Sequence, residues 1–210
     1  MARTLDQCIA SIITDLNRGS EYSARVKEAI VDAIAFYAPT RLGFNTAIAS
    51  VSWSESTYQA LPDNWLEMDY VRLTATSYRE PLEERSTAWM NELDIPMSPI
   101  LGRPNFYCIE TRQIRVYPKP DQDYGATVAY LVALPEVSLS ADGTVTNAWL
   151  DEGWPLIKAR ASIDLIENYL GGEELMQRVG RLMMREDTTL DSMKRRANRE
   201  QGSGHVEPYL

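Results

Sequence analysis

The rest of this chain is expected to be organised around the stretch from Phe106 to Leu134. It reads Phe106-Tyr-Cys-Ile-Glu-Thr-Arg-Gln-Ile-Arg-Val-Tyr-Pro-Lys-Pro120 and, after a polar loop, Ala126-Thr-Val-Ala-Tyr-Leu-Val-Ala-Leu134. Apolar residues alternate with polar or small ones, and β-branched and aromatic residues are frequent, which is typical of strands. Pro118 and Pro120 end the middle strand because proline has no N–H to donate to a neighbouring strand. The stretch therefore predicts a β-meander that helices from both ends of the chain hold in place.

Helical periodicity dominates before this stretch. Apolar residues recur at helical spacing from Leu5 to Leu16, and Thr4 is placed to act as the N-cap. A second helix is expected from Ser20 until Pro39, and the short link between the two helices predicts an αα-hairpin.

Two further helices are expected near the other end of the chain. The first opens at Trp149-Leu150, has Pro155 in an early turn and stops at Gly171-Gly172. The second runs from about Glu173 towards Arg199. Its apolar stripe is expected to contain Leu175, Val179, Leu182, Met183, Leu190 and Met193.

The residues between the two helical regions change to a period of two. Ala47 to Trp53 and Leu66 to Thr76 predict strands, and Pro81 to Leu93 predicts a short helix or covering loop. The predicted fold class is α+β, because helices and strands are segregated along the chain. The predicted parts are a helical bundle of residues 1–44 and 147–200, an antiparallel β-rich insertion of residues 45–146, and an extended flexible tail of residues 201–210.

Length and charge bound the class of protein. The chain has 210 residues, of which 44% are hydrophobic, so one domain or one domain with a large insertion is expected. A formal net charge of −9 argues against a general nucleic-acid binder, which needs a basic face. The same charge suits a wall that nucleic acid slides past. The sequence has no run of 18 apolar residues, so no membrane partner is expected.

Few residues are placed for catalysis. The single histidine, His205, falls in the predicted tail, which argues against histidine-based triads and metal sites. Cys8 on an apolar helix face and Cys108 in a strand are interpreted as small buried residues. Asp151 and Glu152 precede a helix, where negative charge complements the helix dipole. We therefore expect no enzyme activity, no metal and no cofactor.

The order of these parts resembles the head-to-tail adaptor (connector) proteins of tailed bacteriophages, including the tail tubular protein A type of short-tailed phages. The resemblance covers residues 1–200 and rests on packing patterns and turns. Besides the first helix pair, the segments that carry it are Leu61-Pro-Asp-Asn-Trp65, Phe106 to Pro120, Tyr130 with Leu134-Pro135 and Leu139, and Trp149-Leu150 opening the helix to Tyr169-Leu170.

This resemblance implies a structural protein of the virion neck or tail that is assembled in the host cytoplasm. Such proteins form a ring, commonly dodecameric, beneath the portal and receive the tail tube or nozzle protein on the lower face. The implied partners are the portal protein, the tail tube or nozzle protein, further copies of the chain and, transiently, the passing DNA. Two other functions stay open: a wall-degrading hydrolase that uses only carboxylates, and a monomeric assembly chaperone.

Two sets of site residues follow from the resemblance together with the charge pattern. Residues 55–95 hold nine acids and three bases, a net charge of −6, so we expect a negative channel lining from this half of the chain. The channel-lining candidates are Glu55, Asp63, Glu67, Asp69, Glu80, Glu83 and Glu84. The portal-docking candidates, at the end of the last helix and in the tail, are Arg195, Arg196, Arg199, His205, Val206, Pro208, Tyr209 and Leu210.

Overall fold

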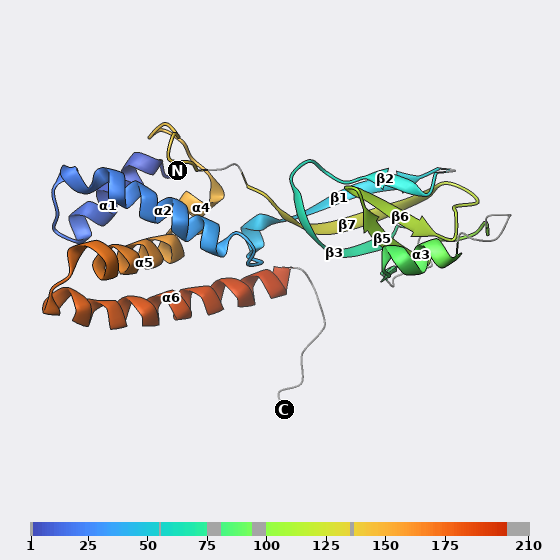
Figure 1. Cartoon of the computed structure of the whole chain (residues 1–210). Coiled ribbons are helices and arrows are strands. Elements are labelled where there is room, and N and C mark those ends of the chain that lie inside the picture. Colours follow the sequence, from blue (N-terminus) through green and yellow to red (C-terminus); the bar gives the residue numbers. More distant parts are fainter. Residues whose placement is uncertain (1, 55, 75–80, 94–99, 135–136, 201–210) are drawn as a thin grey trace, which may run out of the picture. The chain divides into compact units, whose positions relative to one another are not determined.

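The computed structural model describes residues 2–54, 56–74, 81–93, 100–134 and 137–200 (Figure 1). These residues form two compact units, one of helices (Met1–Asn45 with Ala133–Leu210) and one of strands (Thr46–Val132). Helices from both ends of the chain pack together, and antiparallel and mixed sheets form in between, so the predicted α+β class is confirmed. The division places residues 133–146 with the helices, whereas the sequence pattern grouped them with the β-rich insertion.

The first two helices form as the sequence pattern predicts. Helix α1 spans Leu5–Asp15, and Thr4 and Gln7 form a capping box at its start. A short 3₁₀ turn, Ser20–Tyr22, leads directly into α2, Ser23–Tyr37. Both helices bury one apolar face in the core of the helical unit.

Helix α5, Trp154–Leu165, is the most enclosed helix among the described residues. It follows the short helix α4, Ala148–Asp151, and continues as a π-helical turn, Ile166–Leu170. Its buried residues lie on all sides, and the helix contacts α1, α2 and α6. The buried residues of α5 are Trp154, Leu156, Ile157, Ala159, Ala161, Ser162, Ile163 and Leu165.

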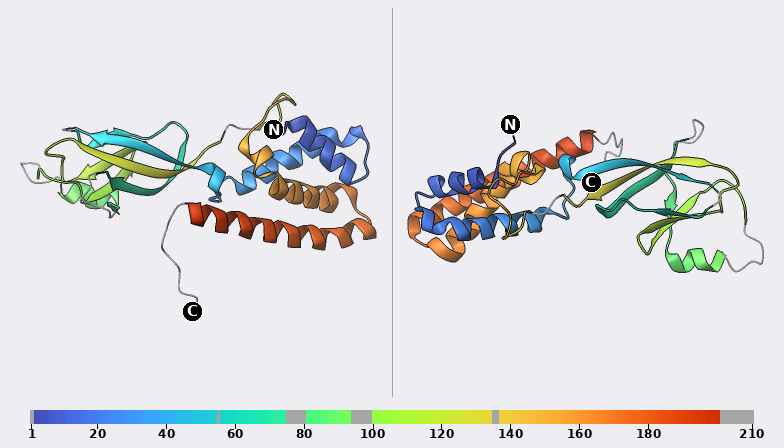
Figure 2. Two further views of the ribbon diagram at one scale, coloured as in Figure 1. Left: turned by 180° about the vertical axis from the view of Figure 1, so that it is seen from behind. Right: turned by 90° about the horizontal axis from the view of Figure 1, so that it is seen from above.

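Helix α6, Glu173–Glu200, is 28 residues long and runs alongside α5 (Figure 2). Gly171 and Gly172 separate it from the preceding turn with φ angles of 56° and 97°, which favour glycine. Val179 and Ala197 are buried, but Met183, predicted for the apolar stripe, is 43% exposed. Met183 follows Leu182 by one residue, so its side chain is turned about 100° around the helix and falls at the edge of the stripe.

The strands form two sheets. The first has the order β1 (Thr46–Trp53), β7 (Tyr124–Val132), β3 (Trp65–Leu73), and both pairings are antiparallel. The second has four strands in the order β2-β6-β5-β4. Its strands are β2 (Tyr58–Ala60), β6 (Gln113–Tyr117), β5 (Phe106–Glu110) and β4 (Glu83–Glu84). Helix α3, Thr87–Leu93, contacts β5.

The predicted β-meander is therefore wrong in one pairing. Strands β5 and β6 form a hairpin, but β6 and β7 belong to different sheets. Strand β7 is nine residues long and buried or half-buried along its whole length, so it needs a neighbour on each edge. Strands β1 and β3, with eight and nine residues, match that length, whereas β6 has five. Pro118 and Pro120 end β6 before it could continue beside β7.

Candidate interaction surfaces

A buried carboxylate helps to hold α6 on the helical unit. Glu186 lies at a position of α6 where the apolar stripe would place a hydrophobic residue, and it is buried. The hydroxyl of Tyr37 on α2 donates a hydrogen bond to this carboxylate, and Nη1 of Arg160 on α5 lies 3.8 Å from its Oε1. Burial, and next the hydrogen bond to Glu186, raise the pKa of Tyr37. One side chain of α6 is thus fixed to both α2 and α5.

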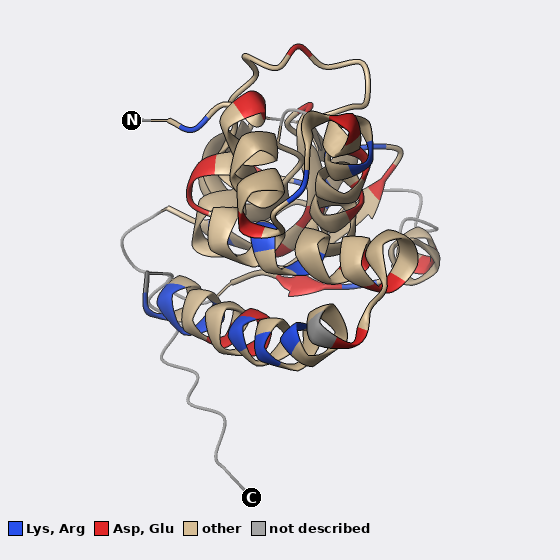
Figure 3. Ribbon diagram, turned by 90° about the vertical axis from the view of Figure 1, so that its left-hand side faces the viewer, with Lys and Arg blue, Asp and Glu red and all other residues tan. Residues whose placement is uncertain are grey.

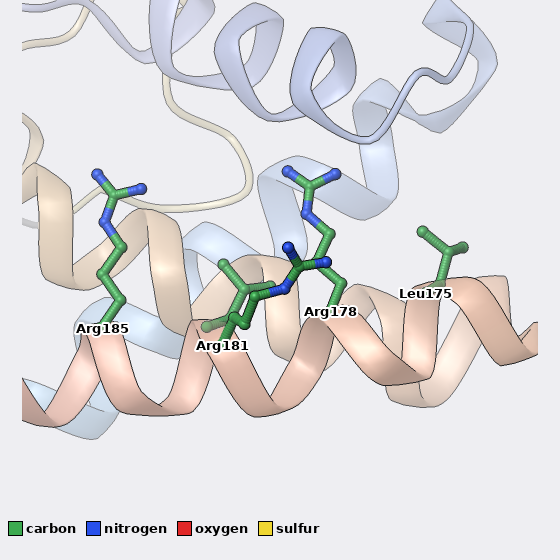
Figure 4. A pocket seen from close by; sticks show the side chains of 5 residues that line it. Leu175, Arg178, Arg181 and Arg185 are labelled. Carbon is green, nitrogen blue, oxygen red and sulfur yellow. The ribbon is translucent and has the colours of Figure 1, made fainter.

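Three arginines project from one side of α6 and are called the arginine face below: Arg178, Arg181 and Arg185 (Figure 4). Together with Leu175 and Leu182 they line a hollow of about 490 Å³. Nη1 of Arg178 donates a hydrogen bond of 2.8 Å to the carbonyl oxygen of Asp15, at the end of α1. Figure 3 shows that lysine and arginine recur along α6.

The sequence pattern did not single out the arginine face. Its signal was present, because residues at i, i+3 and i+7 share one side of a helix. The sequence pattern instead predicts docking at the basic cluster of residues 194–199, because that cluster lies at the end of the predicted helix.

That second basic cluster borders a hollow of its own. Arg195, Arg196 and Arg199 are exposed and line a volume of about 610 Å³ together with Asp187, Thr188, Asp191 and Ser192. Because two carboxylates share this surface, its charge is mixed, unlike that of the arginine face. The other portal-docking candidates, namely His205, Val206, Pro208, Tyr209 and Leu210, lie outside the described residues.

The channel-lining candidates lie on edge strands and in one turn of the β unit. Asp63 lies in the turn before β3, and Glu67 and Asp69 lie in β3, an edge of the first sheet. Glu83 and Glu84 form β4, an edge of the second sheet. Charged residues on an edge strand also discourage pairing with a stray strand, so these acids have a structural role available to them. Glu55 and Glu80 lie outside the described residues.

Two of these acids, Asp69 and Glu84, both influence the pKa of the buried Tyr107 hydroxyl. The hydroxyl of Tyr107 donates a hydrogen bond of 3.3 Å to Glu84. Burial is the largest cause that raises the pKa of Tyr107, and the charges of Glu84 and Asp69 raise it further. The structure therefore brings Asp69 and Glu84 towards one buried group, while Asp63 and Glu67 are exposed.

Reactive groups are sparse in the part of the chain that the structure describes. Among these residues, no three His, Cys, Asp or Glu side chains are grouped so that they could hold a metal ion. Both cysteines are buried, as the sequence pattern predicts. Burial raises the pKa of the Cys8 thiol to about 12 and also raises that of Cys108, so neither thiol is activated as a nucleophile. Within the same residues, no helix combines the length and apolar character of a membrane span.

The described residues combine a helical bundle, whose long helix α6 carries two arginine-lined hollows, with a β unit whose edge strands carry acids. Such exposed charged surfaces suit a structural protein that contacts other proteins. Comparison with known families makes this specific: the family model described as SU10 adaptor protein matches residues 3–201. The chain belongs to this family and is a phage head-to-tail adaptor. Among curated proteins, no sequence matches the chain.

Proposed function

We propose that this chain forms or joins a closed ring beneath the portal, where it connects the capsid to the tail and lets DNA pass. The match to the adaptor family over nearly the whole chain carries this proposal. An adaptor must bind other virion proteins, and the exposed charged surfaces of α6 offer contacts for them. Copies of one chain build a ring when a heterologous contact between them closes.

In this proposal the acids of the β unit face the channel. Asp63, Glu67, Glu83 and Glu84 are exposed, and Glu83 forms an ion pair with Arg85. In this proposal the net negative charge of this surface repels DNA. Like charge keeps a polyanion from adhering within about a Debye length, roughly 10 Å at moderate salt. A channel wall of this kind would let DNA pass without holding it.

The end of α6 and the residues after it dock on the portal in this proposal. Arg195 and Arg199 are exposed near the end of the helix, and cations there would steer the chain towards an acidic partner surface. The sequence Val206-Glu-Pro-Tyr-Leu210 has too few apolar residues for a core but enough to fill a groove on a partner.

Reconstitution with the portal protein of the same phage tests the proposed function. Purified chain and portal are mixed at micromolar concentration, separated by size, and the complex is weighed by native mass spectrometry and imaged by electron microscopy. We expect a ring of the chain on one end of the portal. A chain that never co-migrates with portal, or that binds as a single copy, contradicts the proposal.

A further inference from the structure

The arginine face has three cations and no carboxylate partner within the described residues. Arg181 and Arg185 are exposed and make no hydrogen bond or ion pair there, and Arg178 donates only to the carbonyl oxygen of Asp15. The three side chains stand around one hollow whose remaining lining is Leu175 and Leu182 (Figure 4). A surface of this kind fits a ligand with several negative charges.

The surroundings favour a protein ligand over nucleic acid. The exposed part of α6 is rich in arginine and methionine and poor in lysine, which is the composition of protein interfaces. Met176, Met183 and Met184 are all exposed on the same helix, the last at 73%. The sequence of α6 contains no aromatic residue on which a base could stack.

A matching acidic surface lies on α2 and the 3₁₀ turn before it and is called the acidic row: Glu21, Glu28 and Asp32. Glu28 and Asp32 are four residues apart on α2 and therefore share one side of that helix, and Glu21 lies in the 3₁₀ turn that leads into it. Glu28 is paired with the exposed Arg25, at 3.0 Å, while Glu21 and Asp32 are exposed and have no ion pair among the described residues. No ion pair or hydrogen bond joins the acidic row to the arginine face within one chain, in the part that the structure describes.

The two surfaces lie on different helices of the same unit. The arginine face extends about 10 Å along α6, from Arg178 to Arg185. The acidic row extends from the 3₁₀ turn onto α2. The chain thus carries a basic surface and an acidic surface, and neither neutralises the other.

We infer that the arginine face binds the acidic row of a second copy of this chain. The contact is heterologous, because it joins two different surfaces, and each copy keeps one surface free for the next neighbour. Met184, exposed three residues after Arg181 on α6, supplies apolar, adaptable contact area next to the arginines. This inference rests on the proposed ring, for which it supplies a specific contact between neighbours.

A charge-swap experiment tests the contact on the full chain. One variant carries Arg181→Glu and Arg185→Glu, and the other carries Glu21→Arg and Asp32→Arg. A control carries Arg18→Glu and Lys194→Glu, which changes the net charge as much as the first variant does at exposed sites outside both surfaces. Self-association is followed by sedimentation velocity from micromolar to millimolar protein at low and high salt, and circular dichroism checks the fold of each variant.

We expect wild type and control to self-associate at low salt and to weaken as salt rises. Each swap variant alone should associate at least about tenfold more weakly, because two like-charged surfaces then meet. An equimolar mixture of both variants should recover association, since the acidic row that remains in one meets the arginine face that remains in the other. If a reversal unfolds the chain, Arg181→Gln with Arg185→Gln replaces it, with an intermediate weakening expected.

Three outcomes overturn the inference. If both swap variants associate like wild type, the arginine face is not the contact, although the proposed ring would stand. If wild type stays monomeric throughout, the self-contact is wrong, and the proposed function is judged by portal binding alone. If wild type binds duplex DNA through the arginine face without self-association, the ligand of that face is nucleic acid.

Discussion

The phenol of Tyr37 on α2 donates a hydrogen bond to the buried carboxylate of Glu186 on α6, 149 positions later in the sequence. Among the described residues of α6, the other buried side chains, those of Val179 and Ala197, are apolar and slide more readily past their neighbours, so this buried polar contact favours one alignment of the helix. The guanidinium of Arg160 on α5 lies beside the same carboxylate, with Nη1 3.8 Å from Oε1. Its Cζ atom lies over the ring of Phe36, 4.2 Å from the ring centre. The three helices thus meet at one acid.

Removing the hydroxyl should weaken the attachment of α6. Tyr37→Phe leaves the buried carboxylate without its donor, and we expect a loss of about 1–3 kcal/mol in the free energy of unfolding. Urea denaturation followed by circular dichroism measures this loss. Tyr22→Phe is the matched control, since the Tyr22 hydroxyl makes no hydrogen bond within the described residues. Equal stabilities of the two variants would contradict the role given to Tyr37.

Alkaline pH should destabilise the protein through Cys8. Burial, opposed in part by Arg3 and Lys158, raises the pKa of this thiol from 9.0 to about 12. Between these pH values the unfolded chain releases the proton while the folded chain keeps it, so the free energy of unfolding falls as pH rises. The contribution is complete below pH 9 and is lost by about pH 12.

The variant Cys8→Ser isolates that contribution. Its hydroxyl does not titrate in this range, so the stability of the variant should depend less on pH between 9 and 12 than that of wild type. Chemical denaturation at a series of pH values measures how the free energy of unfolding depends on pH for wild type and for the variant. Subtracting one dependence from the other cancels the contribution of the buried tyrosines, which both proteins share. Parallel slopes would show that the thiol does not hold its proton in the folded state.

One substitution in the turn of the β5–β6 hairpin should stabilise the protein. Its two turn residues, Thr111 and Arg112, have φ angles of 49° and 61°, a conformation in which β-branched side chains are disfavoured. Thr111→Asn should raise the free energy of unfolding by about 1 kcal/mol, because asparagine tolerates positive φ better. Thermal denaturation should show a higher midpoint than that of wild type for Thr111→Asn, and no increase for Thr111→Val.

Reversing charge on the β unit should slow the passage of DNA. Particles carrying Asp63→Lys, Glu67→Lys and Glu83→Lys are expected to assemble but to eject DNA more slowly, because the wall would then attract phosphate. The slowing should diminish at high salt. Fluorescence of a DNA-binding dye during triggered ejection follows the rate. Reversal of Glu152, Glu167 and Glu173 on the helical unit is the matched control, and equal rates in the two particles would argue against an acidic channel wall.

Deletion of residues 202–210 should separate folding from docking. The helical unit keeps its core, so circular dichroism and thermal midpoint should stay unchanged. Retention on immobilised portal should fall at least about tenfold, because the apolar residues that fill the partner groove are gone. Undiminished retention of the truncated chain would place the portal contact elsewhere.

The sequence predicted well those features that local chemistry determines. Thr4 caps α1, Gly171 and Gly172 precede α6, and the fold class follows from the change of period between helices and strands. It did not predict the neighbours of β7, because strand pairing depends on the length and burial of distant segments. The position of Glu186 within an apolar stripe was also missed, since its partners Tyr37 and Arg160 are close only in the folded chain.

The burial of the cysteines protects them from oxidation in an adaptor outside a host cell, where no repair enzymes reach the protein. With a pKa of about 12, the Cys8 thiol is ionised in only about one molecule in 10⁵ at neutral pH, and peroxides react with the ionised form. The exposed thioethers of Met176, Met183 and Met184 have no such protection. Oxidative damage during storage should therefore accumulate as sulfoxide along α6, while both thiols remain reduced.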